Sequence, residues 1–232
     1  MPDFSDGAEV TEVTHAAKRE ARTALLARRR ALSAPQRAAA AASVQVELVA
    51  LVRRLRPRLM TAYVPVGSEP GGPELPQVLH GALPPGGELL LPVLRDDLDL
   101  DWAAWAGPDA LVAAGRGMRE PDGPRRGVAA IARAELVVVP ALAVDRRGRR
   151  LGRGGGSYDR ALARVPATAL TVVPLHDGEL VDALPAEPHD RPVRAVVTPA
   201  DGLRTLDAAL GPGPTGGRGV APHTSAGRTR GR

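Results

Sequence analysis

The residue types best suited to chemistry gather in one stretch of the chain, where an apolar run gives way to a loop rich in glycine and arginine. The run LVVVPALAV (136–144) precedes a turn at Arg147–Gly148, and a helix is predicted to begin with Ser157, Tyr158 and Asp159. The loop between turn and helix holds Arg150, Gly152, Arg153, Gly154, Gly155 and Gly156. Glycines let backbone N–H groups come close to phosphate oxygens, and the arginines add positive charges. This pattern predicts an anion site.

Other interpretations of this loop can be compared with the anion site. No Gly-Lys-Ser/Thr follows the glycines, which excludes a Walker A loop, and the glycine spacing does not match the dinucleotide-binding fingerprint. The remaining alternative is a tight turn from strand to helix in which the glycines serve backbone geometry alone. The local pattern leaves both interpretations open.

A second candidate is Lys18, the only lysine among 31 basic residues. It precedes Arg22 by four positions, so the two share one face of a predicted helix, and Leu25 and Arg29 continue that face. A compact ammonium group is well suited to hold a phosphate as a point charge. The alternative is a solvated surface lysine, and Arg19, Arg28 and Arg30 are expected to be solvated.

Two helices are predicted to open the fold. The segment from Thr14 to Leu32 is rich in Ala, Leu and Arg, which favour helix. Ser33, followed three residues later by Gln36, forms a capping box that would start a second helix, ending near Leu55. Its apolar stripe, which should pack on a sheet, consists of Val44, Leu48, Leu51, Val52 and Leu55.

After Pro57 the chain alternates between short apolar runs and helix-like segments. The helix-like segments lie near 74–83, 128–134 and 158–164. The apolar runs are LMTAYVPV (59–66), ELLLPVL (88–94), LVVVPALAV (136–144), ALTVVPL (169–175) and VRAVVTP (193–199). Near-continuous apolar runs are typical of strands covered on both faces, so we predict an α/β fold with a largely parallel layered sheet flanked by helices. Residues 98–121 fit least well, and we expect a short edge strand through Trp102 followed by an irregular loop.

Composition excludes several classes of protein. The chain has no cysteine, which excludes disulfides, Cys-ligated metals and thiol nucleophiles and fits a cytoplasmic location. No apolar run approaches the ~20 residues that a membrane-spanning helix needs. Residues 211–232 hold four arginines and no acid, so the net charge of +5 falls to +1 for 1–210, with 27 basic and 26 acidic residues. We therefore expect no nucleic-acid or membrane partner.

The same patterns divide the chain into three segments. Residues 1–13 are predicted to be a flexible N-terminus and 14–202 a single α/β catalytic domain. Residues 203–232, rich in Gly, Pro and Arg, are predicted to be a disordered basic tail. We expect a monomer.

The glycine-rich stretch resembles the signature of the 5-formyltetrahydrofolate cyclo-ligase (5,10-methenyltetrahydrofolate synthetase) family. The signature stands here as PALAVD (140–145) and GRRLGRGGGSYD (148–159). The resemblance covers about residues 14–200 and includes, in order, Lys18 and Arg22, YVPVGSE (63–69), LLLPV (89–93), GMREP (117–121) and PAEPHD (185–190). It implies a fold related to sugar-phosphate isomerases and CoA transferases. The implied activity is ATP-dependent conversion of 5-formyltetrahydrofolate to 5,10-methenyltetrahydrofolate, with release of ADP and phosphate.

The resemblance also implies roles for individual residues. Arg153 and Tyr158 are the expected catalytic residues. Glu69 and Tyr158 are expected to contact the folate, and Trp102 is a candidate for the wall of its pocket. Asp159 and Asp190 would bind Mg²⁺; their alternatives are a helix-end acid and a turn residue. The ATP site would comprise Lys18, Arg22, Arg150, Gly152, Arg153, Gly154, Gly155, Gly156, Ser157 and Tyr158.

Three positions depart from the family pattern. Ser157 replaces an aromatic residue, Ala141 replaces a glycine, and Pro70-Gly71-Gly72 stands where the family commonly has Asp-Thr. Two alternative functions therefore remain open. One is a ligase or kinase-like enzyme of the same fold that acts on another carbonyl compound. The other is a non-catalytic nucleotide- or RNA-binding protein that uses the arginine-rich helix and tail.

Overall fold

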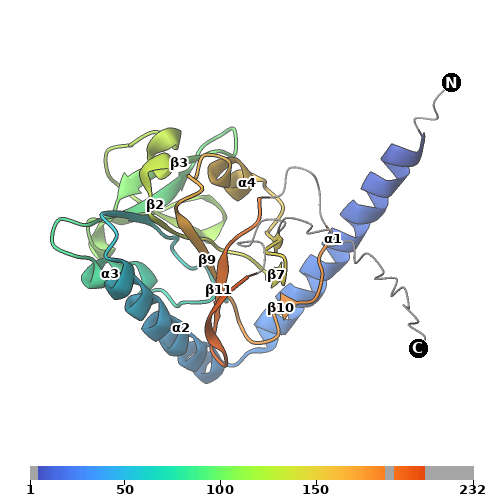
Figure 1. Ribbon diagram of the computed structural model, residues 1–232, viewed down its shortest axis with the longest axis horizontal. Coiled ribbons are helices and arrows are strands. Elements are labelled where there is room, and N and C mark those ends of the chain that lie inside the picture. Colours follow the sequence, from blue (N-terminus) through green and yellow to red (C-terminus); the bar gives the residue numbers. More distant parts are fainter. Residues whose placement is uncertain (1–4, 186–190, 207–232) are drawn as a thin grey trace, which may run out of the picture.

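The computed structural model describes residues 5–185 and 191–206, which form a central sheet with helices on both faces (Figure 1). The helices are α1 (Ser5–Ala31), α2 (Ala34–Leu55), α3 (Leu75–Ala82) and α4 (Ser157–Leu162), with 3-10 turns η1 (Pro108–Ala110), η2 (Gly115–Gly117) and η3 (Val128–Arg133). The strands are β1 (Leu59–Thr61), β2 (Glu88–Leu94), β3 (Leu100–Ala104), β4 (Leu111–Ala113), β5 (Arg119–Pro121), β6 (Leu136–Val138), β7 (Ala143–Asp145), β8 (Arg150–Leu151), β9 (Leu170–Pro174), β10 (Leu180–Val181), β11 (Ala195–Thr198) and β12 (Gly202–Thr205).

The main sheet has the strand order β12-β11-β9-β6-β1-β2-β3. Its five inner strands run parallel, and the edge strands β3 and β12 are antiparallel to their neighbours. Met60 of β1 pairs with Leu89 on one side and Leu136 on the other. From β1 the chain adds β2 on one side and later β6, β9 and β11 on the other. The strand order therefore reverses beside β1, and such switch points carry ligand sites at the carboxyl ends of the strands.

Apolar residues cover both faces of this sheet, as the near-continuous apolar runs predict. On one face α2 and α3 pack on Met60, Leu89 and Leu136. On the other face α4 and η3 pack on the alternate residues, including Leu90 and Val137. This three-layer arrangement confirms the predicted fold class.

Helix α2 forms as its sequence predicts. Ser33 and Gln36 make both hydrogen bonds of the capping box, at 3.3 Å and 2.8 Å. The predicted stripe is buried at Val44, Leu48, Leu51 and Val52. Leu55 is the exception, 43% exposed in the last turn before the left-handed residue Arg56 ends the helix.

A smaller sheet of order β10-β7-β8 lies beside α1 (Figure 1). Leu25 of α1 packs there with Leu142, Ala143 and Leu151. The apolar run 136–144, predicted as one strand, is in fact two strands in two different sheets. Pro140, which has no N–H to donate, lies where the chain leaves the main sheet.

Other boundaries also differ from the sequence predictions. Helix α1 begins at Ser5, inside the segment 1–13 that was expected to be flexible, and β12 crosses the predicted domain end at 202. Residues 98–121 contain not only the predicted edge strand but also a β4–β5 hairpin. The tail from 207 onward lies outside the described residues. None of the helices in the described part of the chain is both long and apolar enough to cross a bilayer.

Candidate functional site

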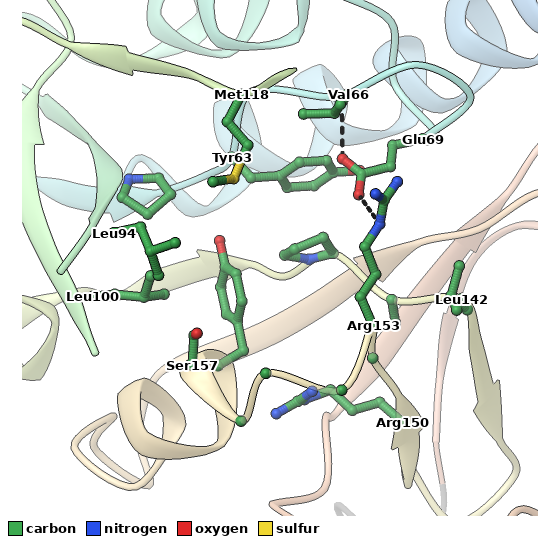
Figure 2. Close-up of a pocket in the computed structure, with 18 of the residues that line it drawn as sticks. Tyr63, Val66, Glu69, Leu94, Leu100, Met118, Leu142, Arg150, Arg153 and Ser157 are labelled. Carbon is green, nitrogen blue, oxygen red and sulfur yellow. Dashed lines mark hydrogen bonds and ion pairs between the residues drawn. The ribbon is translucent and has the colours of Figure 1, made fainter. Parts of the chain in front are cut away.

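A cavity of about 340 Å³ opens where the carboxyl ends of β1, β2 and β6 meet the glycine-rich loop and helix α1. Figure 2 shows side chains from loops far apart in sequence converging on it. Of the predicted site residues that the structure describes, all line it except Trp102. The predicted residues in the lining are Lys18, Arg22, Glu69, Arg150, Gly152, Arg153, Gly154, Gly155, Gly156, Ser157, Tyr158 and Asp159.

The glycine-rich loop joins β8 to α4 and forms one wall of the cavity. Gly154 and Gly156 have φ angles of 104° and 70°, which L side chains rarely adopt. Arg22 donates from Nε to the carbonyl oxygen of Gly152 at 3.0 Å, and its guanidinium carbon lies 3.5 Å from the place that a Cβ on Gly154 would occupy. Among the described residues, none accepts a backbone hydrogen bond from the N–H groups of Gly154, Gly155 or Gly156. The glycines are thus needed for the geometry of a loop whose donors remain available to a ligand.

Arg150 and Asp159 form an ion pair across the base of this loop, with Nη2 and Oδ1 2.6 Å apart. The Arg150 side chain is 4% exposed and that of Asp159 25%. One oxygen of the predicted metal ligand Asp159 is therefore engaged in holding Arg150 between β8 and α4. Asp190, the other predicted metal ligand, lies outside the described residues.

Arg153, from the same loop, and Glu69 face each other (Figure 2). Arg153 Nε lies 3.1 Å from Glu69 Oε1, and Glu69 Oε2 accepts a 2.9 Å hydrogen bond from the N–H of Val66. Glu69 is 11% exposed in its side chain, whereas Arg153 is 54% exposed. Arg153, predicted to bind ATP, is therefore paired with Glu69, predicted to bind the folate. A phosphate that binds Arg153 would free a carboxylate oxygen of Glu69.

Two tyrosines line the cavity as hydrogen-bond donors. Burial, followed by the charge of Glu69, raises the pKa of Tyr158 well above its ordinary value. The buried hydroxyl of Tyr158 has no hydrogen-bond partner among the described residues. Burial and Glu69 also raise the pKa of Tyr63, whose hydroxyl donates to the carbonyl oxygen of Pro70 at 2.7 Å. Both phenols therefore stay protonated at neutral pH, and Tyr158 has a proton to donate to a ligand.

Helix α1 contributes cations to the cavity from one face, as the spacing predicts. Lys18 is 5% exposed, which rules out the alternative of a solvated surface lysine. Arg29, which lies on the same face, also lines the cavity and forms a buried ion pair with Glu179. Sequence reasoning placed Arg29 on this face but gave it no role. Glu179 carries no sequence signal that would have identified it.

Trp102 is located differently from the expectation. Its side chain is fully buried in the core beneath β3, packed with the residues that face α4, and it does not line the cavity. The aromatic ring faces the apolar layer because side chains alternate along an edge strand that is covered on this side.

The β4–β5 hairpin brings Met118 to the cavity instead. Glu120 Oε1 holds this hairpin to β2 by accepting a 2.9 Å hydrogen bond from the N–H of Leu94.

Comparison with known sequences gives matches along most of the chain. The family model of the 5-formyltetrahydrofolate cyclo-ligase family matches residues 14–199. A 5-formyltetrahydrofolate cyclo-ligase of Mycolicibacterium smegmatis is 44% identical over 194 residues, which cover 82% of this chain and 97% of that protein. A 5-formyltetrahydrofolate cyclo-ligase of Escherichia coli is 40% identical over 84 residues, covering 36% of this chain and 46% of that protein.

Solved structures show the same fold. The NMR structure of Aquifex aeolicus 5,10-methenyltetrahydrofolate synthetase matches with a TM-score of 0.64 and 27% identity, covering 89% of this chain and 97% of that one. A 5,10-methenyltetrahydrofolate synthetase from Mycoplasma pneumoniae matches with a TM-score of 0.61 over 77% of this chain and 96% of that one. At 17% identity, this second likeness concerns the fold alone.

Proposed function

Because this chain belongs to the 5-formyltetrahydrofolate cyclo-ligase family, we propose that it converts 5-formyltetrahydrofolate and ATP to 5,10-methenyltetrahydrofolate, ADP and phosphate. The observation that carries the proposal is the convergence of the glycine-rich loop, Lys18, Arg22 and Tyr158 on a single cavity. One part of that cavity is cationic and lined by backbone donors. The other part is lined by apolar side chains, including Leu94, Leu100 and Met118 (Figure 2).

The cationic part suits a triphosphate. Backbone N–H groups of the loop can donate to phosphate oxygens, while Arg153 and Lys18 supply full charges. Arg22 and Arg150 are held in place by Gly152 and Asp159, so their charges are fixed before a ligand arrives. Such preorganised charge favours phosphoryl transfer, in which positioning and neutralisation matter more than a covalent nucleophile.

The apolar part suits the folate, with Tyr158 at the reacting group. The formamide oxygen of the substrate is a poor leaving group, and in the proposed reaction it attacks the γ-phosphorus of ATP, releasing ADP. N10 then attacks the activated formyl carbon and gives up its proton to solvent, and phosphate departs with the former formamide oxygen. The protonated Tyr158 hydroxyl would donate to this region, and Glu69 would accept hydrogen bonds from N–H groups of the pterin.

In this proposal Mg²⁺ binds together with the nucleotide and is not coordinated by protein side chains alone. No group of three metal-binding side chains occurs among the described residues. Mg²⁺ commonly needs only one or two carboxylates, with phosphate and water oxygens completing its shell, and it would neutralise phosphate charge. Asp159 lines the cavity and would supply such a carboxylate. We expect Asp159→Asn to raise the Mg²⁺ concentration for half-maximal rate about tenfold; an unmoved titration midpoint would remove Asp159 from the metal site.

The function is tested by mixing the protein with ATP, Mg²⁺ and 5-formyltetrahydrofolate and following the absorbance of the methenyl product. One ADP should appear for each methenyl product, and leaving out ATP should stop the reaction. Product formed at an undiminished rate without ATP would reject the proposal. Hydrolysis of ATP without methenyl product would favour a ligase or kinase-like enzyme acting on another carbonyl compound.

The same proposal includes the cellular location, oligomeric state and partners of the enzyme. We place it in the cytoplasm as a monomer with a single catalytic domain, a small-molecule substrate, and no nucleic-acid or membrane partner. The near-neutral charge of 1–210 and the absence of cysteine support this placement. Elution at 24.1 kDa in size-exclusion chromatography would support the monomer, and elution at twice that mass would contradict it.

A further inference from the structure

We infer that Arg29, acting through Glu179 and His176, is a positioning residue that sets the relation between helix α1 and the loop that carries Glu69. The inference rests on the proposed function, because it assigns these residues an effect on the binding of ATP and 5-formyltetrahydrofolate. None of the three was identified from the sequence as part of the site. Together they link helix α1 to the segments that follow β6, β9 and β1, which are neighbouring strands of the main sheet.

The centre of this network is a buried ion pair with good geometry. Arg29 donates from Nε to Glu179 Oε1 at 2.7 Å and from Nη2 to Glu179 Oε2 at 2.8 Å. The side chains are 1% and 4% exposed. Nη2 also donates to the carbonyl oxygen of Ala141 at 2.6 Å, and Ala141 lies in the cavity wall after β6. One guanidinium therefore fixes α1 against both the wall of the cavity and the loop after β9.

The network continues from Glu179 to the Glu69 loop. Glu179 Oε2 accepts a 2.8 Å hydrogen bond from the N–H of His176. The ring Nε2 of His176 lies 3.0 Å from the carbonyl oxygen of Ser68, the residue next to Glu69. His176 is itself buried, at 6% exposure, so water does not compete freely for these contacts. Displacement of Glu179 would therefore reach Glu69 through two successive hydrogen bonds.

Helix α1 depends on this network because few apolar side chains hold it. Among its described residues, those that are buried are Lys18, Leu25 and Arg29. Only Leu25 is apolar, and Ala21 and Leu26 pack beside it while partly buried, so apolar packing holds α1 over a small area. Arg29 shares a face with Lys18 and Arg22, and a shift at Arg29 would move both cations relative to the glycine-rich loop. Misplacement by about 1 Å can cost roughly 100-fold in rate.

The test replaces the ion pair by apolar residues of similar size in the double variant Arg29→Met/Glu179→Met. Buried ion pairs can often be replaced in this way, but this variant also leaves the Ala141 carbonyl and the His176 N–H without these partners, so we expect a folded protein with a lowered thermal midpoint. We expect kcat/KM to fall roughly 10- to 100-fold for ATP and for 5-formyltetrahydrofolate. Hydrogen exchange should rise in the segments 66–70 and 140–142. The control Arg30→Met removes an equal charge from an exposed neighbour on α1 and should match the wild type.

A folded double variant with wild-type kinetic constants and exchange would overturn the inference and leave the pair as a structural contact. If the double variant does not fold, Arg29→Lys decides, because it keeps the charge but cannot reach both Glu179 and Ala141 in the same way. A raised KM in folded Arg29→Lys supports positioning, and an unchanged KM rejects it. A wild-type protein that makes no methenyl product would reject the proposed function instead, and the exchange measurement would still test the network.

Discussion

Helices α1 and α2 adjoin in the chain but are attached to the protein in different ways. Helix α2 buries Val44, Leu48, Leu51 and Val52 against the sheet, each at 0–1% exposure. The described part of α1 buries two cations and one leucine, and its contacts with the body include hydrogen bonds from Arg22, Arg28 and Arg29. Apolar packing thus fixes the helix that supports the sheet, and charge fixes the helix that reaches the cavity.

The two kinds of attachment have different energetic consequences. A buried Val or Leu side chain contributes roughly 1.5–3 kcal/mol, in proportion to apolar area and with little directional preference. A buried ion pair contributes little net stability, because desolvation offsets the attraction, but it accepts only one geometry. Mutations of the buried apolar residues of α2 should therefore lower the stability of the protein. Mutations of the charged residues that join α1 to the cavity should instead weaken ligand binding.

The largest effect is expected from the α2 side. Leu48→Ala should lower the free energy of unfolding by about 2–5 kcal/mol, because removing most of this fully buried side chain leaves a cavity in its place. The KM values of the remaining folded enzyme should not change. Denaturant unfolding and steady-state kinetics measure the two quantities. Val46→Ala, at a position on α2 that is 66% exposed, is the control and should stay within about 0.5 kcal/mol of the wild type.

The next effect tests whether ion pairs at the site edge also stabilise the fold. Asp159→Asn should lower the free energy of unfolding by roughly 1.5–3 kcal/mol, because it removes a charged partner from the buried Arg150. The helix end alone would account for only about 0.3–1 kcal/mol. Asp182→Asn, whose pair with Arg146 is exposed, is the control. A loss no greater than that of the control would mean that Arg150 does not depend on Asp159 for its place in the fold.

A smaller effect is expected at Lys18 of α1, which we propose contacts ATP. Lys18→Met should raise KM for ATP about tenfold or more, because one charge-assisted contact is lost. Steady-state kinetics at saturating folate measure it, with the exposed neighbour Arg19→Met as the matched control. Equal KM values in both variants would remove Lys18 from the phosphate site and weaken the contrast between the two helices.

The smallest effect concerns an ion pair away from α1. Arg164 donates two hydrogen bonds to Asp99, at 2.9 Å and 2.6 Å, and these lower the pKa of the Asp99 carboxyl below its ordinary value. A carboxyl group whose pKa is lower in the folded than in the unfolded protein stabilises the fold at pH values above its unfolded pKa. This stabilisation is lost as the pH falls through the pKa of the folded state. The thermal midpoint of Asp99→Asn should therefore fall less than that of the wild type between about pH 5 and pH 2. Parallel midpoint curves for the two proteins would contradict this.

Local sequence signals predicted the scaffold and the glycine-rich loop. The capping box at Ser33 and the stripe on α2 depend on residues three or four positions apart, which a sequence displays directly. The loop from Gly152 to Gly156 is likewise continuous, and two of its glycines, Gly154 and Gly156, have positive φ angles. These features need no knowledge of the rest of the fold.

Features that depend on distant residues were missed or misplaced. Arg29 meets Glu179 across 150 positions, and nothing local to either residue indicates the pairing. Trp102 was considered for the cavity because aromatic residues are scarce, but the alternation along β3 turns it into the core. The pairing of Arg153 with Glu69 likewise requires the loop after β1 and the loop after β8 to be known together.

The long reach of these contacts also concerns the order in which the protein is made. Helix α1 leaves the ribosome before the rest of the described fold, yet Arg22 and Arg29 meet partners 130 and 150 positions later. At roughly 5–20 residues per second, α1 waits about 8–30 s for Glu179, whereas α2 meets α3 soon after both are synthesised. The cavity wall that Arg29 and Glu179 hold together therefore forms only after Glu179 has been synthesised. Stalled chains that end before Glu179 should carry α2 packed on the first strands but should bind no ATP.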